Sequence, residues 1–273
     1  MVRRLARLMI VMVIASTFVA APARAATPSS PALVVLGDSV AAGAGLSPLT
    51  GHPNDGACGR SGQTYAAGVA AARHLTLVNA ACSGARIWDG ILTDQERFRA
   101  TDIPAQRLQV RGTTNVAAVI VTVGANDVHW AQMIEVCAKT ACENRFETAV
   151  YNILATKVSA QLVATLVWTR SLKPGRVFVT GYYDPFAGPT ACAQAGGISS
   201  AEIKWLRARR ADLNGRIQRA AATVPGTTYV PVSFGDRGVC SPRSLVQGRG
   251  STAPLHPTAE GQAVTRNAVL AKW

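Results

Sequence analysis

The chain has 273 residues, a length that suits one large domain or two small ones. Because 48% of the residues are hydrophobic and 16% are charged, the chain can bury a sizeable core, which excludes a disordered protein. Lysine and arginine number 28 against 15 acidic residues, a net charge of +13, and the sequence lacks the repeated period that is typical of solenoids and propellers.

The first 25 residues have the layout of a secretory signal peptide. A basic start with Arg3, Arg4 and Arg7 precedes the apolar run Leu8–Ala21, and Ala23-Arg24-Ala25 supplies small residues for cleavage after Ala25. An uncleaved membrane anchor is the alternative, but the run is shorter than the ~20 residues that a span requires. We therefore expect a secreted protein, and loss of four basic residues with the leader lowers its net charge from +13 to +9.

Short apolar runs rich in β-branched residues predict the strands. Each run is bounded by turn residues, which is typical of strands buried on both faces of a parallel sheet. The predicted strands are Ala32–Leu36, Leu75–Ala80, Val116–Val123, Arg176–Thr180 and Thr228–Val232.

Segments with helical spacing of apolar residues lie between and after these runs. The predicted helices are Ser61–Arg73, Glu143–Arg170, Ser199–Thr223 and Pro257–Lys272. Polar residues interrupt the long segment Glu143–Arg170, so we interpret it as a packed helix and not as a membrane span. Strands and helices in alternation predict an α/β layered fold. No Pro/Gly/Ser-rich linker divides residues 26–273, which are therefore expected to form one domain.

The six cysteines show no paired spacing of the kind that zinc ribbons use. In a secreted chain they predict three disulfides, although spacing alone leaves all 15 connectivities open. Buried free thiols would fit a cytosolic protein better. The cysteines are Cys58, Cys82, Cys137, Cys142, Cys192 and Cys240.

Four separated segments bring polar residues to the carboxyl edge of the predicted sheet, where open α/β sheets bind ligands. Ser39 follows the first strand, Gly84 the second and Asn126 the third, and His256 stands just before the last helix. A hydroxyl, an imidazole and amide donors are the groups that acyl transfer needs. No cluster has metal-ligand spacing, so we expect no metal site. A flavodoxin-like nucleotide binder is excluded, because no Gly-rich phosphate loop follows the first strand.

These segments resemble the SGNH (GDSL) hydrolases. The blocks Gly-Asp-Ser-Val, Ala-Cys-Ser-Gly-Ala, Gly-x-Asn-Asp and His-Pro-x-x-x-Gly occur in family order between Val35 and Gly261. Cys58-Gly59-Arg60-Ser61 followed by Tyr65 looks like the secreted actinobacterial lipase/esterase branch. The resemblance implies a three-layer α/β/α sandwich with a five-stranded parallel sheet. It also implies hydrolysis of carboxylic esters without a metal or other cofactor.

The resemblance assigns roles to the residues that match its motifs. Ser39 would be the nucleophile and His256 the general base. The oxyanion hole would consist of the backbone N–H groups of Ser39 and Gly84 and the side-chain amide of Asn126. Outside this resemblance, Ser39 could cap a helix and Asn126 could close a turn.

The neighbouring polar residues have structural interpretations. We expect Asp38 and Asp127 to bond loop amides beside the active residues. His129 follows Asn126 closely, and we expect it to have a surface or packing role.

One position departs from the family pattern. The family places an Asp three residues before the histidine, whereas this chain has Ala253 there. We expect the Ala253 carbonyl to orient His256 in a Ser39–His256 dyad, as some members of the secreted branch use a backbone carbonyl. The alternative is an acid from elsewhere, with Asp236 as the first choice.

The disulfide pairing is likewise implied by the resemblance. The secreted branch pairs cysteines that are neighbours in sequence. That pattern implies Cys58–Cys82, Cys137–Cys142 and Cys192–Cys240.

Basic residues crowd the predicted helix Ser199–Thr223. A solvated helix face is the plainer interpretation, and weak association with anionic envelope surfaces is the alternative. We predict no nucleic-acid binding, because no recognition motif accompanies the charge. The residues concerned are Lys204, Arg207, Arg209, Arg210, Arg216 and Arg219.

The leading functional hypothesis is a secreted, monomeric serine ester hydrolase acting on small-molecule or lipid esters. A carbohydrate O-acetyl esterase is the alternative within the same fold. A non-catalytic binding protein that retains the fold is the alternative from another class, since the position of the usual Asp holds Ala253.

Overall fold

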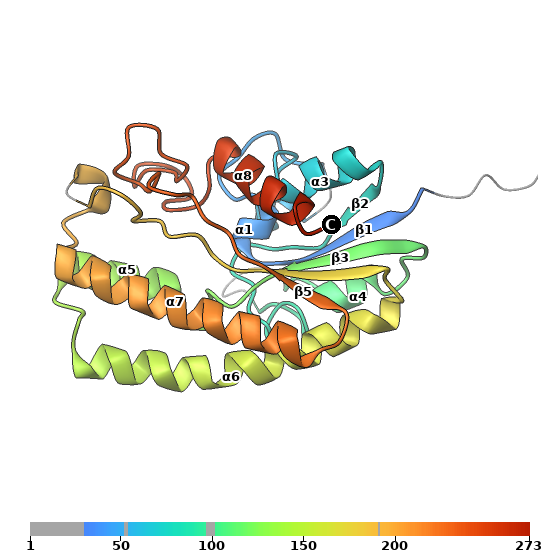
Figure 1. The fold of residues 1–273 in the computed structure, drawn as a ribbon, viewed down its shortest axis with the longest axis horizontal. Coiled ribbons are helices and arrows are strands. Elements are labelled where there is room, and N and C mark those ends of the chain that lie inside the picture. Colours follow the sequence, from blue (N-terminus) through green and yellow to red (C-terminus); the bar gives the residue numbers. More distant parts are fainter. Residues whose placement is uncertain (1–29, 52–53, 97–101, 191) are drawn as a thin grey trace, which may run out of the picture.

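A five-stranded parallel sheet forms the centre of the protein in this computed structural model, which describes residues 30–51, 54–96, 102–190 and 192–273 (Figure 1). The strand order is β2-β1-β3-β4-β5, and every neighbouring pair is parallel. The predicted five-stranded parallel sheet is therefore confirmed. The strands are β1 (Ala32–Gly37), β2 (Thr76–Asn79), β3 (Val116–Thr122), β4 (Arg176–Thr180) and β5 (Thr227–Val230).

Helices cover both faces of the sheet, so the fold has the three predicted layers (Figure 1). On one face, Leu33 and Val35 of β1 pack with residues of α3 (Tyr65–Arg73) and α8 (Ala259–Leu270). On the other face, Val34 and Leu36 share a core with α4 (Gln106–Val110), α5 (Trp130–Lys139), α6 (Arg145–Thr169) and α7 (Ser200–Thr223). Because successive strand residues point to opposite faces, β1 joins the two cores.

Burial on both faces was predicted for all five strands, but this holds only for the three central ones. Residues of β2 and β5 are mostly partly exposed, because these strands lie at the two edges of the sheet. Each edge strand has a neighbouring strand on one side only.

Side-chain caps set the starts of the long helices. The Asn144 side chain accepts a hydrogen bond from the Glu147 N–H at the start of α6, and Ser199 forms a capping box with Glu202 at the start of α7. Residues 145–172, which contain α6, are long and apolar enough to cross a membrane by composition alone. However, α6 packs along α7 and buries residues such as Leu162, as expected for the predicted packed helix.

Several short elements and one longer helix were not predicted. The longer helix is α5, and the short elements are α1 (Ser39–Ala42), α2 (Asp55–Cys58), α4, η1 (Arg170–Leu172) and η2 (Ala193–Ala195). Helix α3 begins at Tyr65 and not at Ser61, because the Thr64 side chain caps it by accepting a bond from the Ala67 N–H. The predicted signal peptide, residues 1–25, lies outside the described residues.

Candidate active site

The turn after β1 places Ser39 at the first position of α1. Gly37 has a φ of +152°, and a Cβ there would lie 2.3 Å from the Thr122 carbonyl oxygen, so only glycine fits this turn. The side-chain amide of Gln106 pairs with both the N–H and the carbonyl of Gly37, at 2.7 and 2.8 Å. The Asp38 carboxylate then caps α1 by accepting a 2.9 Å hydrogen bond from the Val40 N–H. The backbone on both sides of Ser39 is therefore fixed.

His256 lies beside Ser39 although 217 positions separate them in the sequence. The distance between His256 Nε2 and Ser39 Oγ is 2.7 Å, which is a short hydrogen bond. His256 stands in the loop just before α8, and the Thr258 side chain caps that helix. The structure thus brings together the two residues for which the sequence predicts nucleophile and base roles.

A backbone carbonyl orients His256, but it is that of Pro254 and not the expected Ala253. His256 Nδ1 lies 3.0 Å from the Pro254 oxygen. The Ala253 carbonyl instead closes a turn by accepting the His256 N–H at 3.2 Å, and Leu255 within the turn has a φ of +61°. Such a turn with Pro second and a positive φ third is a type II turn. Because the Ala253 carbonyl closes the turn, the carbonyl of the central residue Pro254 accepts the hydrogen bond from His256 Nδ1.

The surroundings keep His256 neutral near pH 7. Burial lowers the pKa of the His256 imidazole below its usual value of 6.5, and the carbonyls of Pro254 and Ala253 oppose that shift only in part. With Nδ1–H donating to Pro254, the Nε2 lone pair faces the Ser39 hydroxyl. The alternative acid, Asp236, is exposed on the surface, and no hydrogen bond joins it to His256 in the part of the chain that the structure describes.

The expected amide donors follow the ends of β1, β2 and β3. Asn126 donates one side-chain N–H to the Ala85 carbonyl at 3.0 Å, which links the third block to the loop that contains Gly84. Gly84 has a φ of +81°, a conformation that favours glycine. Within the described ranges, the backbone N–H groups of Ser39 and Gly84 donate no hydrogen bond, so both remain available to a ligand.

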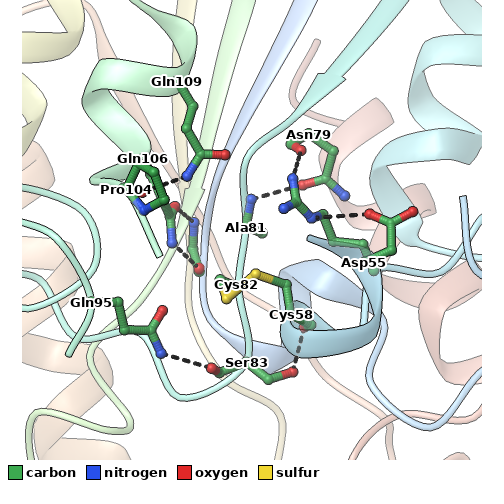
Figure 2. The surroundings of a disulfide bond; sticks show 12 residues. Asp55, Cys58, Asn79, Ala81, Cys82, Ser83, Gln95, Pro104, Gln106 and Gln109 are labelled. Carbon is green, nitrogen blue, oxygen red and sulfur yellow. Dashed lines mark hydrogen bonds and ion pairs between the residues drawn. A yellow bond between two sulfur atoms is a disulfide. The ribbon is translucent and has the colours of Figure 1, made fainter. Parts of the chain in front are cut away.

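A disulfide and a buried ion pair hold the Gly84 loop in place (Figure 2). Ser83, just after Cys82, donates both its N–H and its hydroxyl to the Cys58 carbonyl, at 2.9 and 2.7 Å. Gln95 supports the loop from the other side by donating to the Ser83 carbonyl at 2.9 Å. Arg60 is only 1% exposed and lies 3.3 Å from Asp55, so the segment that contains Cys58 is itself rigid.

All six cysteines form disulfides in the pairs that the family resemblance implies. These are Cys58–Cys82, Cys137–Cys142 and Cys192–Cys240.

An apolar cavity of about 330 Å³ opens beside Ser39, Asn126 and His256. Helices α5 and α7 and the loops after β4 and before α8 supply its apolar walls, a lining typical of ligand pockets. Glu135, Arg210 and Arg249 add charge to it. The apolar walls include Trp130, Ile134, Tyr183, Pro185, Leu213 and Leu255.

Two acids, the buried Asp38 and the half-buried Asp127, flank the site and bond to loop amides, as predicted. Both oxygens of the Asp127 carboxylate accept from the Ile87 N–H, at 3.1 and 3.2 Å, and burial raises its pKa to about 6. Burial also raises the pKa of Asp38 to about 7, and hydrogen bonds from Tyr182 and from the Val40 N–H oppose that rise. His129 lies at the start of α5, with Nε2 3.4 Å from the Arg86 guanidinium.

Tyr182 and Tyr183, which the sequence analysis did not single out, both line the cavity. They follow β4, which ends at Thr180, after a single intervening residue, Gly181. The rule that placed the other site residues at strand ends therefore also applies to them.

Much of the positive charge on α7 has partners within the protein, which the solvated-face interpretation did not expect. Arg207 and Arg216 form ion pairs with Asp184 and Asp212, at 2.8 and 2.7 Å. Two further basic residues bind neutral groups: Arg209 lies over the rings of Tyr151 and Trp205, and Arg210 donates to the Tyr182 carbonyl.

One group of possible metal ligands occurs within the described residues, and its atoms are already in use. Cys142, Glu143 and Glu202 lie together, but Cys142 is in a disulfide and Glu202 accepts hydrogen bonds from two backbone N–H groups. These residues do not fit a metal ion.

Comparison with known proteins decides the family. The model of the GDSL-like lipase/acylhydrolase family matches residues 35–264, which is most of the chain. The chain belongs to the GDSL-like lipase/acylhydrolase family. It is therefore a carboxylic ester hydrolase by family.

Individual relatives agree with this family assignment. Lipase 2 of Streptomyces coelicolor is 28% identical over 269 residues, which covers 89% of this chain and 85% of the relative. Phospholipase A1 of Streptomyces albidoflavus has the same fold, with a TM-score of 0.72, 23% identity, and coverage of 90% of this chain and 100% of that one. An extracellular lipase of Streptomyces rimosus has a TM-score of 0.72 and 24% identity, covering 89% of this chain and 99% of that chain. The carbohydrate esterase alternative is not favoured by these comparisons.

Proposed function

We propose that this GDSL-family protein is a secreted, monomeric serine hydrolase that cleaves small-molecule or lipid carboxylic esters through an acyl-enzyme on Ser39. The observation that carries the proposal is the 2.7 Å contact between Ser39 Oγ and His256 Nε2. A serine hydroxyl is a weak nucleophile until a base removes its proton, and a neutral imidazole at this distance is such a base.

The reaction uses His256 twice. Ser39 Oγ attacks the ester carbonyl carbon while its proton moves to His256 Nε2. The protonated imidazole then gives this proton to the departing alcohol oxygen, which leaves an acyl-Ser39 ester. Water attacks that ester, His256 accepts the water proton and returns it to Ser39 Oγ, and the carboxylic acid is released.

Charge on the carbonyl oxygen develops in both attacks. The N–H groups of Ser39 and Gly84 have no other partner in the described chain, and the Asn126 amide keeps one N–H beyond its bond to Ala85. These three donors are our proposed oxyanion hole. The loss of one such donor typically costs about 10²–10³ in turnover.

Orientation of the base is assigned to the Pro254 carbonyl. Its hydrogen bond to Nδ1 selects the tautomer with the lone pair on Nε2, the task that a carboxylate performs in a Ser-His-Asp triad. We propose this dyad in place of a triad that includes Asp236.

The apolar walls of the cavity fit an acyl chain better than an acetyl group on a sugar. Export fits the three disulfides, because disulfides persist outside the cytosol. We propose cleavage of the leader after Ala25, which intact-mass measurement of the secreted protein would test.

The test is hydrolysis of p-nitrophenyl esters of short and medium chain length by the wild type, Ser39→Ala and Asp236→Asn. We expect Ser39→Ala to lose about 10³–10⁴ or more in kcat, whereas Asp236→Asn keeps wild-type turnover. Equal rates for the wild type and Ser39→Ala would refute the Ser39 acyl-enzyme and favour a binding protein. A thousand-fold loss in a folded Asp236→Asn variant would contradict the dyad.

A further inference from the structure

Tyr182 joins two parts of the site that are far apart in the sequence. Its hydroxyl donates a hydrogen bond to Oδ2 of Asp38, the residue before Ser39. The same hydroxyl accepts a 3.1 Å hydrogen bond from the N–H of Ala125, the residue before Asn126. One phenol oxygen therefore contacts both the block with the nucleophile and the block with the side-chain oxyanion donor.

The tyrosine itself is held rigidly by α7. The backbone N–H of Tyr182 donates to Asn214 Oδ1, and the Asn214 amide donates back to the Tyr182 carbonyl, both at 2.8 Å. Arg210 donates a second hydrogen bond to the same carbonyl, at 3.2 Å. Because both backbone groups are fixed and the side chain is 7% exposed, the hydroxyl has little freedom to move.

The partners of the hydroxyl are buried as well. Asp38 is 1% exposed, and its other oxygen caps α1 through the Val40 N–H. A movement of the Asp38 carboxylate would therefore shift the first turn of α1, which carries Ser39. We infer that Tyr182 is a positioning residue that sets the distance between the Ser39 nucleophile and the Asn126 oxyanion donor. This inference rests on the proposed function.

The variant Tyr182→Phe removes the hydroxyl and keeps the ring. It leaves a buried oxygen of Asp38 and the Ala125 N–H without this partner. The two loops then lose the hydrogen bonds that connect them through one hydroxyl group. Since a misplacement of about 1 Å can cost 10²-fold in rate, we expect kcat to fall about 10- to 100-fold. KM should stay within about two-fold, because phenylalanine keeps the aromatic ring of this cavity-lining residue.

The matched control is Tyr151→Phe. Tyr151 is fully buried, and its hydroxyl also has two partners, the Arg209 carbonyl at 2.9 Å and Asp212 at 2.8 Å. It lies on α6, away from the cavity. We expect this variant to lose stability as Tyr182→Phe does but to keep wild-type kcat.

A pH profile provides a second readout that a purely structural role would not change. Ionised Asp38 accepts hydrogen bonds from both the Val40 N–H and the Tyr182 hydroxyl. Protonation of the carboxylate would add a second hydrogen between Asp38 Oδ2 and the Tyr182 oxygen. The bond from Tyr182 lowers the pKa of Asp38, so its removal should move the acidic limb of kcat to higher pH. The other titratable groups near Asp38 are Asp127, Tyr65, Tyr183 and His256.

The experiment measures kcat, KM and the pH profile for the wild type and both tyrosine variants with one p-nitrophenyl ester. A selective kcat loss in Tyr182→Phe, with a shifted acidic limb, supports the positioning role. A kcat within two-fold of wild type, an unshifted limb, or an equal loss in Tyr151→Phe would overturn it. The Ser39→Ala result separates the two ideas, because an inactive wild type or an active Ser39→Ala would refute the proposed function itself.

Discussion

Removal of the Cys58–Cys82 disulfide should lower both stability and turnover. The bridge joins residues 24 positions apart, and the loop-entropy relation gives about 3.5 kcal/mol for a closed loop of this size. The Cys137–Cys142 bridge joins residues 5 positions apart, for which the same relation gives about 2 kcal/mol. We therefore expect the double variant Cys58→Ala/Cys82→Ala to lose more stability than the double variant Cys137→Ala/Cys142→Ala.

The effect on turnover distinguishes the two bridges. Ser83 makes two hydrogen bonds to the Cys58 carbonyl, and Gly84, a proposed oxyanion donor, follows it. Without the covalent link, the segment that contains Cys58 can move away, and the Gly84 N–H moves with Ser83. We expect kcat to fall about ten-fold or more, towards the cost of losing one oxyanion donor.

Urea unfolding without reductant measures the stability of each variant, and ester hydrolysis at a temperature where all variants are folded measures kcat. The Cys137→Ala/Cys142→Ala variant should keep wild-type kcat, since its bridge lies at the end of α5 away from Trp130. Wild-type turnover in a destabilised Cys58→Ala/Cys82→Ala variant would refute the coupling between this bridge and the oxyanion loop.

Two further predictions concern charge. Because burial raises the pKa of Asp127 from 3.8 to about 6, its stabilising effect is present below pH 4 and is lost as the pH rises through 6, about 3 kcal/mol in all. Asp127→Asn should reduce the slope measured by urea unfolding between pH 4 and 6 but not abolish it, because Asp38, with a pKa raised to about 7, contributes a slope of the same sign. An unchanged slope would contradict the assignment. Ala253→Asp should not raise kcat, because Pro254 already binds His256 Nδ1, and it should cost stability because position 253 is 7% exposed. A ten-fold gain in kcat would show that the dyad lacks an acid.

The strands and the four site residues could be predicted because each has a local signal. Val116–Val123 has a continuous apolar run, and the observed β3 ends one residue earlier, at Thr122. Ser39, Gly84 and Asn126 each follow a strand, and parallel strands bring their carboxyl ends to one edge. The order of the sheet has no such signal, which is why the edge positions of β2 and β5 were missed.

Helix α5 lacked a start signal. His129, which precedes it, has a φ of +55° and forms no side-chain cap, and Asn and Asp just before it indicate a turn. The first turn of α5 is instead held by backbone bonds, such as the one from the Met133 N–H to the His129 carbonyl. Propensity and capping rules give no account of a helix that begins in this way.

The Pro254 carbonyl was missed for a similar reason. A type II turn needs a positive φ at its third residue, where sequence rules expect glycine or asparagine. Here that residue is Leu255, with a φ of +61°. Its position is held by tertiary contacts, since its carbonyl accepts a 2.7 Å hydrogen bond from the Tyr183 hydroxyl. Only the folded chain shows that the Ala253 carbonyl closes the turn and that the Pro254 carbonyl accepts the hydrogen bond from the imidazole.

A neutral carbonyl in place of a carboxylate has consequences for the pH range of the enzyme. A carboxylate next to His256 would raise the pKa of the imidazole, whereas burial with a carbonyl partner lowers it. The base is then weaker but stays deprotonated at a lower pH. Asp38 has a pKa of about 7, so its protonation comes first as the pH falls. We therefore predict that the acid limit of activity follows protonation of Asp38, which caps α1 and accepts from Tyr182, and not protonation of His256, the proposed base.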